Sequence, residues 1–168
     1  MAAVATLLSD GIAMPAEPAT NRRRSINLPG HNPNLPFSDA VLVDDTLYLA
    51  GRIGIDPVTG RAPADLNAEL KLLFDGVGAV LAEAGMSMDD LVHVQIFSPD
   101  VSLWESFNAA YVQRFSKQLP SRAFLGSGPL LLGGRFEMVG IAVRDAERGR
   151  EEKQKSRIAF PKRPIAWR

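Results

Sequence analysis

The chain has 168 residues, enough for one domain, and a 46% hydrophobic composition that is sufficient for a core. It contains no cysteine, which excludes disulfides, thiolate nucleophiles and cysteine metal sites. The formal net charge is zero, but residues 25–144 carry eight basic and thirteen acidic side chains, a balance of −5 that argues against nucleic-acid binding.

Both ends of the chain are predicted to lie outside the ordered domain. Residues 1–25 are rich in small residues and proline without helical or strand period, so we expect a disordered leader. Its stretch AVATLL resembles a signal-peptide core, but no basic residues precede it, which favours a cytoplasmic over a periplasmic or secreted location. Residues 146–168 form a basic tail. No apolar run approaches the ~20 residues that a membrane helix requires.

The domain is expected to span residues 26–145 and to open with a β-hairpin. The stretch DAVLVDDTLYLAG alternates apolar and polar residues and breaks at Asp44-Asp45, which predicts two antiparallel strands. The following IDPVTG predicts a turn, because Pro57 fixes φ and Gly60 supplies a left-handed position.

A long helix is predicted from Leu66 to Gly85, with glycine suited to its C-terminal cap. Its apolar residues fall on one face at Leu66, Leu70, Leu73, Phe74, Val77, Val80 and Leu81. Gly76 and Gly78 lie inside it and each costs roughly 1 kcal/mol relative to alanine. We therefore expect close packing of the helix on a sheet at both glycines.

A strand and a second helix follow. LVHVQIF predicts a strand with Val92, Val94 and Ile96 on one face. Asp100 is placed to cap a helix over residues 101–116. The apolar face of this helix carries Trp104, Phe107, Tyr111 and Phe115, and Asn108 lies on the same face. The structural interpretation of Asn108 is an amide bonded to loop backbone.

Two final strands are predicted, RAFLG and RFEMVGIAVR. The order predicts an α+β fold, a mixed sheet with two helices on one face. The other face would be bare in a monomer, including some of Val139, Ile141 and Val143. Self-association is the expected remedy.

Several familiar chemistries find little support. GSGPLLLGG lacks the Lys-Ser/Thr of a phosphate loop, and no GxSxG motif is present. The carboxylate pairs at 44–45 and 89–90 are better explained as turn caps than as acid/base pairs. His31 and His93 lie far apart without helical spacing, so no metal site is expected.

Arg122 is the strongest candidate for binding. In a strand it shares a face with Phe124 and Gly126, while Ala123 and Leu125 take the other face. A guanidinium fork in such a partly apolar place matches a carboxylate bidentately. From sequence alone, a salt bridge between elements or subunits explains the residue slightly better than a ligand does, and both interpretations stay open.

Four segments in order resemble the RidA (YjgF-like) family over roughly residues 26–145. They are LPFSDAVLVDDTLYLAGRIGIDPVTG, AVLAEAGMSMDDL, VHVQIFSPDVSLWESFNAAY, and PSRAF followed by FEMVGIAVR. The resemblance implies a chorismate mutase-like homotrimer with active sites between subunits and no cofactor. It also implies hydrolysis of enamine/imine acids, of the 2-aminoacrylate/2-iminopropionate type, to 2-oxo acids and ammonia.

The resemblance assigns roles by position. Arg122 looks like the catalytic arginine that grips the substrate carboxylate. The implied substrate-binding residues are Phe37, where tyrosine is frequent, Gly51, Arg52, where glutamine is common, Asn108, and Phe124. Arg52 is interpreted either as a second positive charge that favours dicarboxylic ligands or as a solvent-facing loop arginine.

Two positions depart from well-known members. Phe124 stands where they carry cysteine, and Val139 stands where they carry a second glutamate that helps to orient water. Glu137 is retained, but it lies two residues away on the same strand face, so the pattern does not let it take over. The alternative function is a small-carboxylate-binding trimer with little or no turnover, and an endoribonuclease or translation-inhibitor role is less favoured.

Overall fold

A computed structural model describes residues 23–116 and 118–144. The strands and α-helices are, in chain order, β1 Arg23–Ile26, β2 Ala40–Val43, β3 Thr46–Ile53, α1 Leu66–Glu83, β4 Leu91–Ser98, α2 Trp104–Tyr111, β5 Ser121–Gly126 and β6 Glu137–Val143. Short 3₁₀ turns are η1 Met88–Asp90, η2 Val101–Leu103, η3 Val112–Arg114 and η4 Leu131–Gly133.

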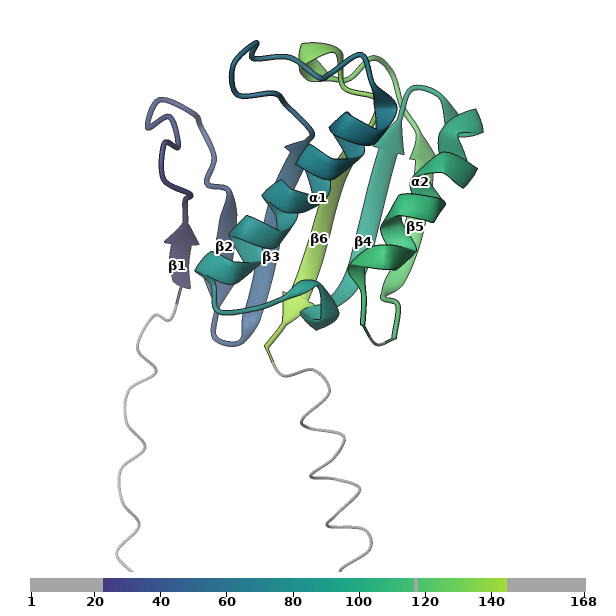
Figure 1. The fold of residues 1–168 in the computed structure, drawn as a ribbon. Helices are drawn as coiled ribbons and strands as arrows, with labels where there is room; N and C mark the ends of the chain where they lie inside the picture. Colours follow the sequence, from purple (N-terminus) through teal and green to yellow (C-terminus); the bar gives the residue numbers. More distant parts are fainter. Residues whose placement is uncertain (1–22, 117, 145–168) are drawn as a thin grey trace, which may run out of the picture.

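The strands form one six-stranded sheet in the order β1-β2-β3-β6-β4-β5. Only β4 and β5 pair in parallel, since α2 carries the chain from one to the other. Both helices lie on the same side of the sheet (Figure 1). The predicted α+β fold, a mixed sheet with two helices on one face, is therefore confirmed.

The hairpin and the turn that follows it are confirmed. β2 pairs antiparallel with β3, and Asp44 takes a left-handed φ of 53° between them. Gly60 has a φ of 67° and donates its backbone N–H to the carbonyl of Asp56. β2 pairs only as far as Leu49, so the second half of β3 lies beside the loop of residues 27–39 instead of a strand.

Helix α1 buries the predicted apolar face. Asp65 caps its N-terminus by accepting from the backbone of Ala68 at 2.9 Å, and Gly85 follows its C-terminus with a φ of 70°. At Gly76 a Cβ atom would lie 3.2 Å from the Arg52 side chain, so close packing there is confirmed. At Gly78 no atom lies within 4 Å of such a Cβ, and that prediction is wrong.

Strand β4 corrects one predicted face. Val94 and Ile96 are buried under the helices, but Val92 is exposed and Leu91 is buried in its place. The register against β6 shifts between Leu91 and His93, and this bulge turns the extra residue outward.

The second helix is shorter than predicted. Residues 101–116 form the turn η2, the eight-residue α2, the turn η3 and two residues beyond it. Asp100 accepts from the backbone N–H of Ser102 at 2.9 Å, so its predicted capping role holds at η2. Phe107 and Tyr111 are buried, whereas Trp104 is exposed.

A buried ion pair fixes the start of β6. Glu69 of α1 is fully buried and accepts from Nε of Arg135 at 2.5 Å and from the Arg135 backbone at 2.6 Å. The guanidinium of Arg135 also donates to the carbonyls of Pro63 and Ala64. Since Glu137 follows Arg135 by two residues, this ion pair helps to fix the position of Glu137 at the start of β6.

The helix-free face of the sheet is apolar at several positions. Val139, Ile141 and Val143 are only half-buried on it, and Tyr48 pairs with Ile141 and is exposed. Nothing in the described part of the chain covers these residues.

The structure tests only the first of the predicted domain boundaries, and it moves that boundary toward the N-terminus. Residues 23–25, assigned to the leader, belong to β1 and pair with β2. The rest of the leader and the whole basic tail lie outside the described residues. In residues 23–116 and 118–144, no helix is both long and apolar enough to cross a membrane.

Candidate active site

Arg122 lies on the edge strand β5 and points toward the helices. It pairs in register with Val94 of β4, and Phe124 pairs with Ile96. Val94 and Ile96 are both buried under the helices, and residues in register point to the same side of a sheet. Arg122 and Phe124 therefore share the helix face, as the strand period predicts.

Helix α2 surrounds the guanidinium with its polar and aromatic face. Nη2 of Arg122 donates to Oδ1 of Asn108 at 2.6 Å. The guanidinium carbon lies 4.6 Å from the ring centroids of both Trp104 and Tyr111. Helical spacing brings residues 104, 108 and 111 to one face, so a single helix builds this cradle. We call Arg122, Asn108, Trp104 and Phe124 the arginine cluster.

The contact of Asn108 corrects its sequence interpretation. Its amide oxygen accepts from Arg122, not from the N–H of loop backbone. Asn108 thus holds the guanidinium in its orientation.

Arg122 is a cation without a matching anion. Burial lowers the pKa of its guanidinium, and the nearby Tyr111 opposes that shift, but an arginine stays charged in either case. No carboxylate pairs with it among the residues that the structure describes. A salt bridge between elements is therefore absent from this part of the chain, while one between subunits stays a prediction. Donors remain for an external anion.

Tyr111 adds an unusual group beside this cation. Its side chain is 2% exposed, and its hydroxyl has no hydrogen-bond partner in the described structure. Burial raises the pKa of Tyr111 to about 12, although the positive charge of Arg122 acts in the opposite direction. The phenol is neutral at any physiological pH.

We predict that Tyr111→Phe stabilises the protein by on the order of 1 kcal/mol at pH 7, because it removes a buried hydroxyl without a partner. The pKa of Tyr111 is higher in the folded protein than the ordinary value near 10, so the unfolded chain loses this proton first as pH rises. The wild-type protein therefore keeps its full stability below about pH 10 and loses part of it as pH rises through 12. Urea unfolding at pH 7 and pH 11 measures both effects. Wild type should lose more stability than the variant between these pH values, and equal losses would contradict the assignment.

A second group of predicted residues lines a cavity of about 760 Å³ beside the second half of β3 and the start of β6. The cavity is lined by Leu35, Phe37, Asp39, Ala50, Gly51, Arg52, Ile53, Ile55, Pro57, Leu72, Asp75, Gly76, Leu131, Leu132 and Glu137. It forms where β3 has no strand neighbour on its outer side. We call it the glutamate cavity.

Glu137 is the residue that the sequence analysis noted but did not assign to the site. Its carboxylate lies against Gly51, where a Cβ atom would come within 1.8 Å of Oε1. No hydrogen bond or ion pair holds this carboxylate within the described chain. Val139 lines neither this cavity nor the neighbouring one. The position emphasised by the resemblance is thus not where this chain places its carboxylate.

Arg52 is neither a free second charge nor a solvent-facing loop residue. It lies in β3, and its Nη2 donates to Oδ1 of Asp39 at 3.0 Å. Asp39 also accepts from the backbone of Leu28 at 2.8 Å and lies 3.3 Å from Nδ1 of His31. Arg52 therefore fastens the 27–39 loop, which carries Phe37, to the sheet.

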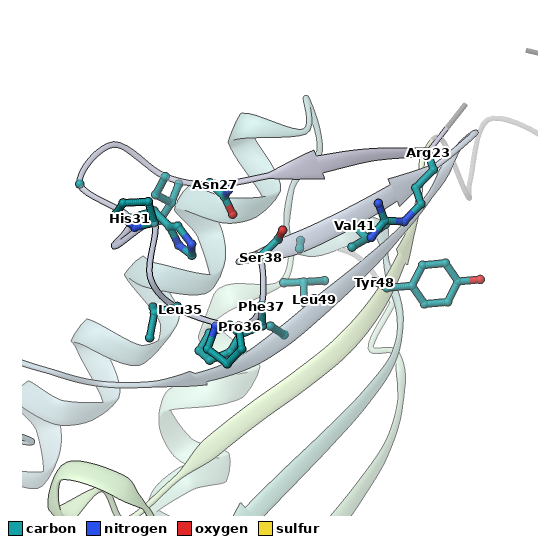
Figure 2. Close-up of a pocket in the computed structure, with 15 residues that line it drawn as sticks. Arg23, Asn27, His31, Leu35, Pro36, Phe37, Ser38, Val41, Tyr48 and Leu49 are labelled. Atoms are coloured by element: carbon teal, nitrogen blue, oxygen red, sulfur yellow. The ribbon is translucent and has the colours of Figure 1, made fainter. Parts of the chain in front are cut away.

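That loop covers a neighbouring cavity of about 910 Å³. Figure 2 shows His31, Pro36 and Phe37 on the loop, with Val41 and Leu49 on the strands. Phe37 lines both cavities and is exposed. It consequently stands at the boundary between them.

The predicted residues fall into two groups that the fold does not join. Phe37, Gly51 and Arg52 meet Glu137 at the glutamate cavity, whereas Arg122, Asn108 and Phe124 line neither cavity. In the sheet β6 and β4 separate β3 from β5. In the described ranges, no three or more His, Cys, Asp or Glu side chains are placed to hold a metal ion.

Comparison with known proteins identifies the family of the chain. The profile of the family described as Endoribonuclease L-PSP matches residues 30–144. The chain belongs to this family. It is the RidA (YjgF-like) family that the sequence motifs resemble, and the matched residues include both the arginine cluster and the glutamate cavity.

Members of the family with related sequences come from distant organisms. A Bos taurus protein named 2-iminobutanoate/2-iminopropanoate deaminase is 34% identical over 110 residues, which span 65% of this chain and 80% of that protein. A RutC family protein of Pyrococcus abyssi is 31% identical over 111 residues, spanning 66% and 87% respectively.

Solved structures share the fold. The Rid family protein YyfA of Yersinia pestis, described as of unknown function, has a TM-score of 0.66 at 27% identity and covers 72% of this chain and 98% of that one. Escherichia coli TdcF, solved with bound serine, has a TM-score of 0.62 at 26% identity and covers 75% and 96%.

Proposed function

We propose that this protein hydrolyses 2-imino acids and their enamine tautomers to 2-oxo acids and ammonia. The observation that carries the proposal is Arg122, a partly buried cation with free donors and no carboxylate partner in the described structure. The names of relatives from Bos taurus, Capra hircus and Homo sapiens agree with it. So does TdcF, whose bound serine is an amino acid with a free carboxylate group.

In the proposed reaction, the guanidinium fork of Arg122 accepts the substrate carboxylate bidentately while Asn108 holds its Nη2. Glu137 takes a proton from water as the oxygen bonds to the imine carbon. Glu137 returns that proton to the nitrogen, which gives a carbinolamine. The hydroxyl proton then passes to the amino nitrogen, the C–N bond breaks, and ammonia leaves as the C=O bond of the 2-oxo acid forms. Orientation of the substrate by the site as a whole supplies up to about 7–11 kcal/mol of the acceleration, and the general base about 10²–10⁴-fold.

We further propose that the two groups meet between subunits of a homotrimer. Two observations support this arrangement: the arginine cluster and the glutamate cavity are separate within one chain, and the helix-free sheet face is apolar. Glu137 lies on that face, whereas Arg122 lies on the helix side of the edge strand β5, so a copy packed on the face would have to reach Arg122 around the edge of the sheet.

Complementation tests the shared site. Arg122→Ala and Glu137→Gln are each expected to be inactive, and trimers co-assembled from equal amounts of both should regain about a quarter of wild-type activity. Sedimentation gives the assembly state of each sample. No recovery in verified mixed trimers would show that each site lies within one chain.

The reaction itself is tested by coupling. An amino-acid oxidase or a pyridoxal-phosphate dehydratase releases the imino acid, and 2-oxo acid and ammonia are followed with and without this protein. The proposal fails if neither appears faster with the protein present. Thermal stabilisation by 2-oxobutyrate without any acceleration would instead select the carboxylate-binding alternative.

Gly51 offers a test of the position of the carboxylate. Gly51→Ala is expected to lower kcat about 100-fold, since the new Cβ displaces the Glu137 carboxylate and a misplacement of about 1 Å costs that much. The free energy of unfolding should change by roughly 0.5 kcal/mol or less, because the clash involves the far end of a flexible side chain.

The matched control is Gly78→Ala in α1, where a Cβ meets open space. It is expected to keep full activity and to gain up to about 1 kcal/mol of stability. If both alanine variants are equally active in the coupled assay, Gly51 does not belong to the active site.

A further inference from the structure

We infer that the imino acids this protein prefers carry a large apolar side chain, of the size found in leucine, methionine or phenylalanine. The inference rests on the proposed function and names its substrate class. Two separate regions of the chain carry it, one at the arginine cluster and one at the glutamate cavity.

At the arginine cluster, an aromatic wall stands beside the anchor for the carboxylate. Trp104 is 44% exposed although it is the largest side chain of α2. Its ring packs edge-on against Phe124 with centroids 5.2 Å apart. Phe124 follows Arg122 by two strand positions, about 6–7 Å along the same face. A carboxylate held by Arg122 therefore places its α-substituent next to these rings.

The apolar surface continues beyond Trp104. Val101 is exposed, and a Cβ on Gly126 would lie 3.4 Å from its Cγ1 atom. Gly126 ends β5 on the face that also carries Arg122 and Phe124. A methyl group, such as that of 2-iminopropanoate, reaches little of this surface, whereas a leucine- or phenylalanine-sized group covers it.

The glutamate cavity has the same character. Its charged lining groups other than Glu137 have partners: Asp39 with Arg52, and Asp75 with Lys71 and Arg114. Most of its remaining walls are apolar, from Leu35, Phe37, Ile53, Ile55, Leu72, Leu131 and Leu132. Its volume of about 760 Å³ lies within the range of about 300–1,000 Å³ typical for drug-sized ligands.

The rim of this cavity is held in an unfavourable backbone conformation. Leu131 is 77% exposed and Leu132 is 51% exposed, and Leu132 has φ 56° and ψ 19°. A left-handed conformation is unfavourable for a residue with a side chain as large as leucine. The carbonyl of Leu132 accepts from the backbone of Ala62 at 3.1 Å, which fixes this turn. Backbone strain of this kind is found most often at active sites, ligand contacts and switch regions, which supports a ligand-binding role for this rim.

A substrate series tests the inference. Imino acids are generated by an amino-acid oxidase from alanine, 2-aminobutyrate, leucine, methionine and phenylalanine, and kcat/KM is measured for each. We expect the leucine- and phenylalanine-derived acids to exceed 2-iminopropanoate by about tenfold or more. If 2-iminopropanoate is the best substrate, the inference is overturned while the deaminase proposal stands. If none is accelerated, the deaminase proposal itself fails.

Two variants and a control assign the preference to these residues. Leu132→Gly relieves the left-handed backbone and removes the side chain, and Trp104→Ala removes the exposed ring. Each is expected to reduce the ratio of kcat/KM for the large acid over 2-iminopropanoate by about fivefold or more. Val112→Ala, an exposed residue just after α2, should leave the ratio unchanged.

The assembly state of these variants shows whether the exposed apolar residues contact the substrate or a neighbouring subunit. Sedimentation of Leu132→Gly and Trp104→Ala is expected to match wild type. If either variant dissociates, or if its kcat/KM falls by the same factor for every substrate, the exposed apolar residues serve subunit contact and the inference is wrong.

Discussion

Arg122→Ala is expected to lower kcat/KM for imino-acid hydrolysis by roughly 30- to 5,000-fold. Truncating one partner of a buried charge pair costs about 2–5 kcal/mol, and each 1.36 kcal/mol is about a factor of ten in rate. The loss should appear with every imino acid, since each carries the same carboxylate. Coupled assays with at least two substrates measure it.

Two arginine controls accompany this variant. Arg122→Lys keeps the charge but loses the fork, so we expect an intermediate kcat/KM with a raised KM. Arg144→Ala removes another partly buried arginine, which donates to the carbonyls of Ala84 and Gly85, and should leave kcat/KM intact. Wild-type kinetics for Arg122→Ala would refute the anchoring role and leave Arg122 as an α2 packing residue.

Glu137→Gln is expected to reduce kcat by about 10²–10⁴-fold with little change in KM, because it removes the general base but preserves shape. The carboxylate makes no hydrogen bond or ion pair within the described chain, so the free energy of unfolding should change little. Single-turnover rates with a preformed imino acid separate this chemical step from binding.

Val139 supplies the contrasting position for this prediction. If the second site on β6 mattered for this chain, Val139→Glu would restore turnover to Glu137→Gln. We expect no restoration, since Val139 lines neither cavity and pairs with Gln95 in the sheet. Recovery in the double variant would move the base from Glu137 to position 139.

Local patterns predicted the elements whose stability is local. The apolar stripe of α1, its cap at Gly85 and the break at Asp44-Asp45 all follow from residues close in sequence, and the structure has them. The exposure of Val92 and the strand β1 were not predicted, because both depend on residues distant in sequence. A bulge depends on the partner strand, and Arg23–Ile26 becomes a strand only by pairing with β2.

The same distinction applies to the candidate site. The strand period placed Arg122 and Phe124 on one face correctly, because side-chain alternation is a local property. The contacts between Asn108 and Arg122 and between Asp39 and Arg52 each join two different elements of the fold, so local patterns did not predict them. Glu137 was underestimated because its proximity to Gly51 exists only once β3 and β6 pair.

From the strand order we also predict a sequence of folding events. Val94 meets Arg122 across one short helical connection, whereas Thr46 meets Val143 only after nearly all of the described chain has been made. Local contacts form fastest, and closing a longer loop costs more entropy. β6 then enters the centre of the sheet, between β3 and β4. A nascent chain therefore builds its cation cradle early, and acquires its carboxylate and its completed sheet face together, with the last strand.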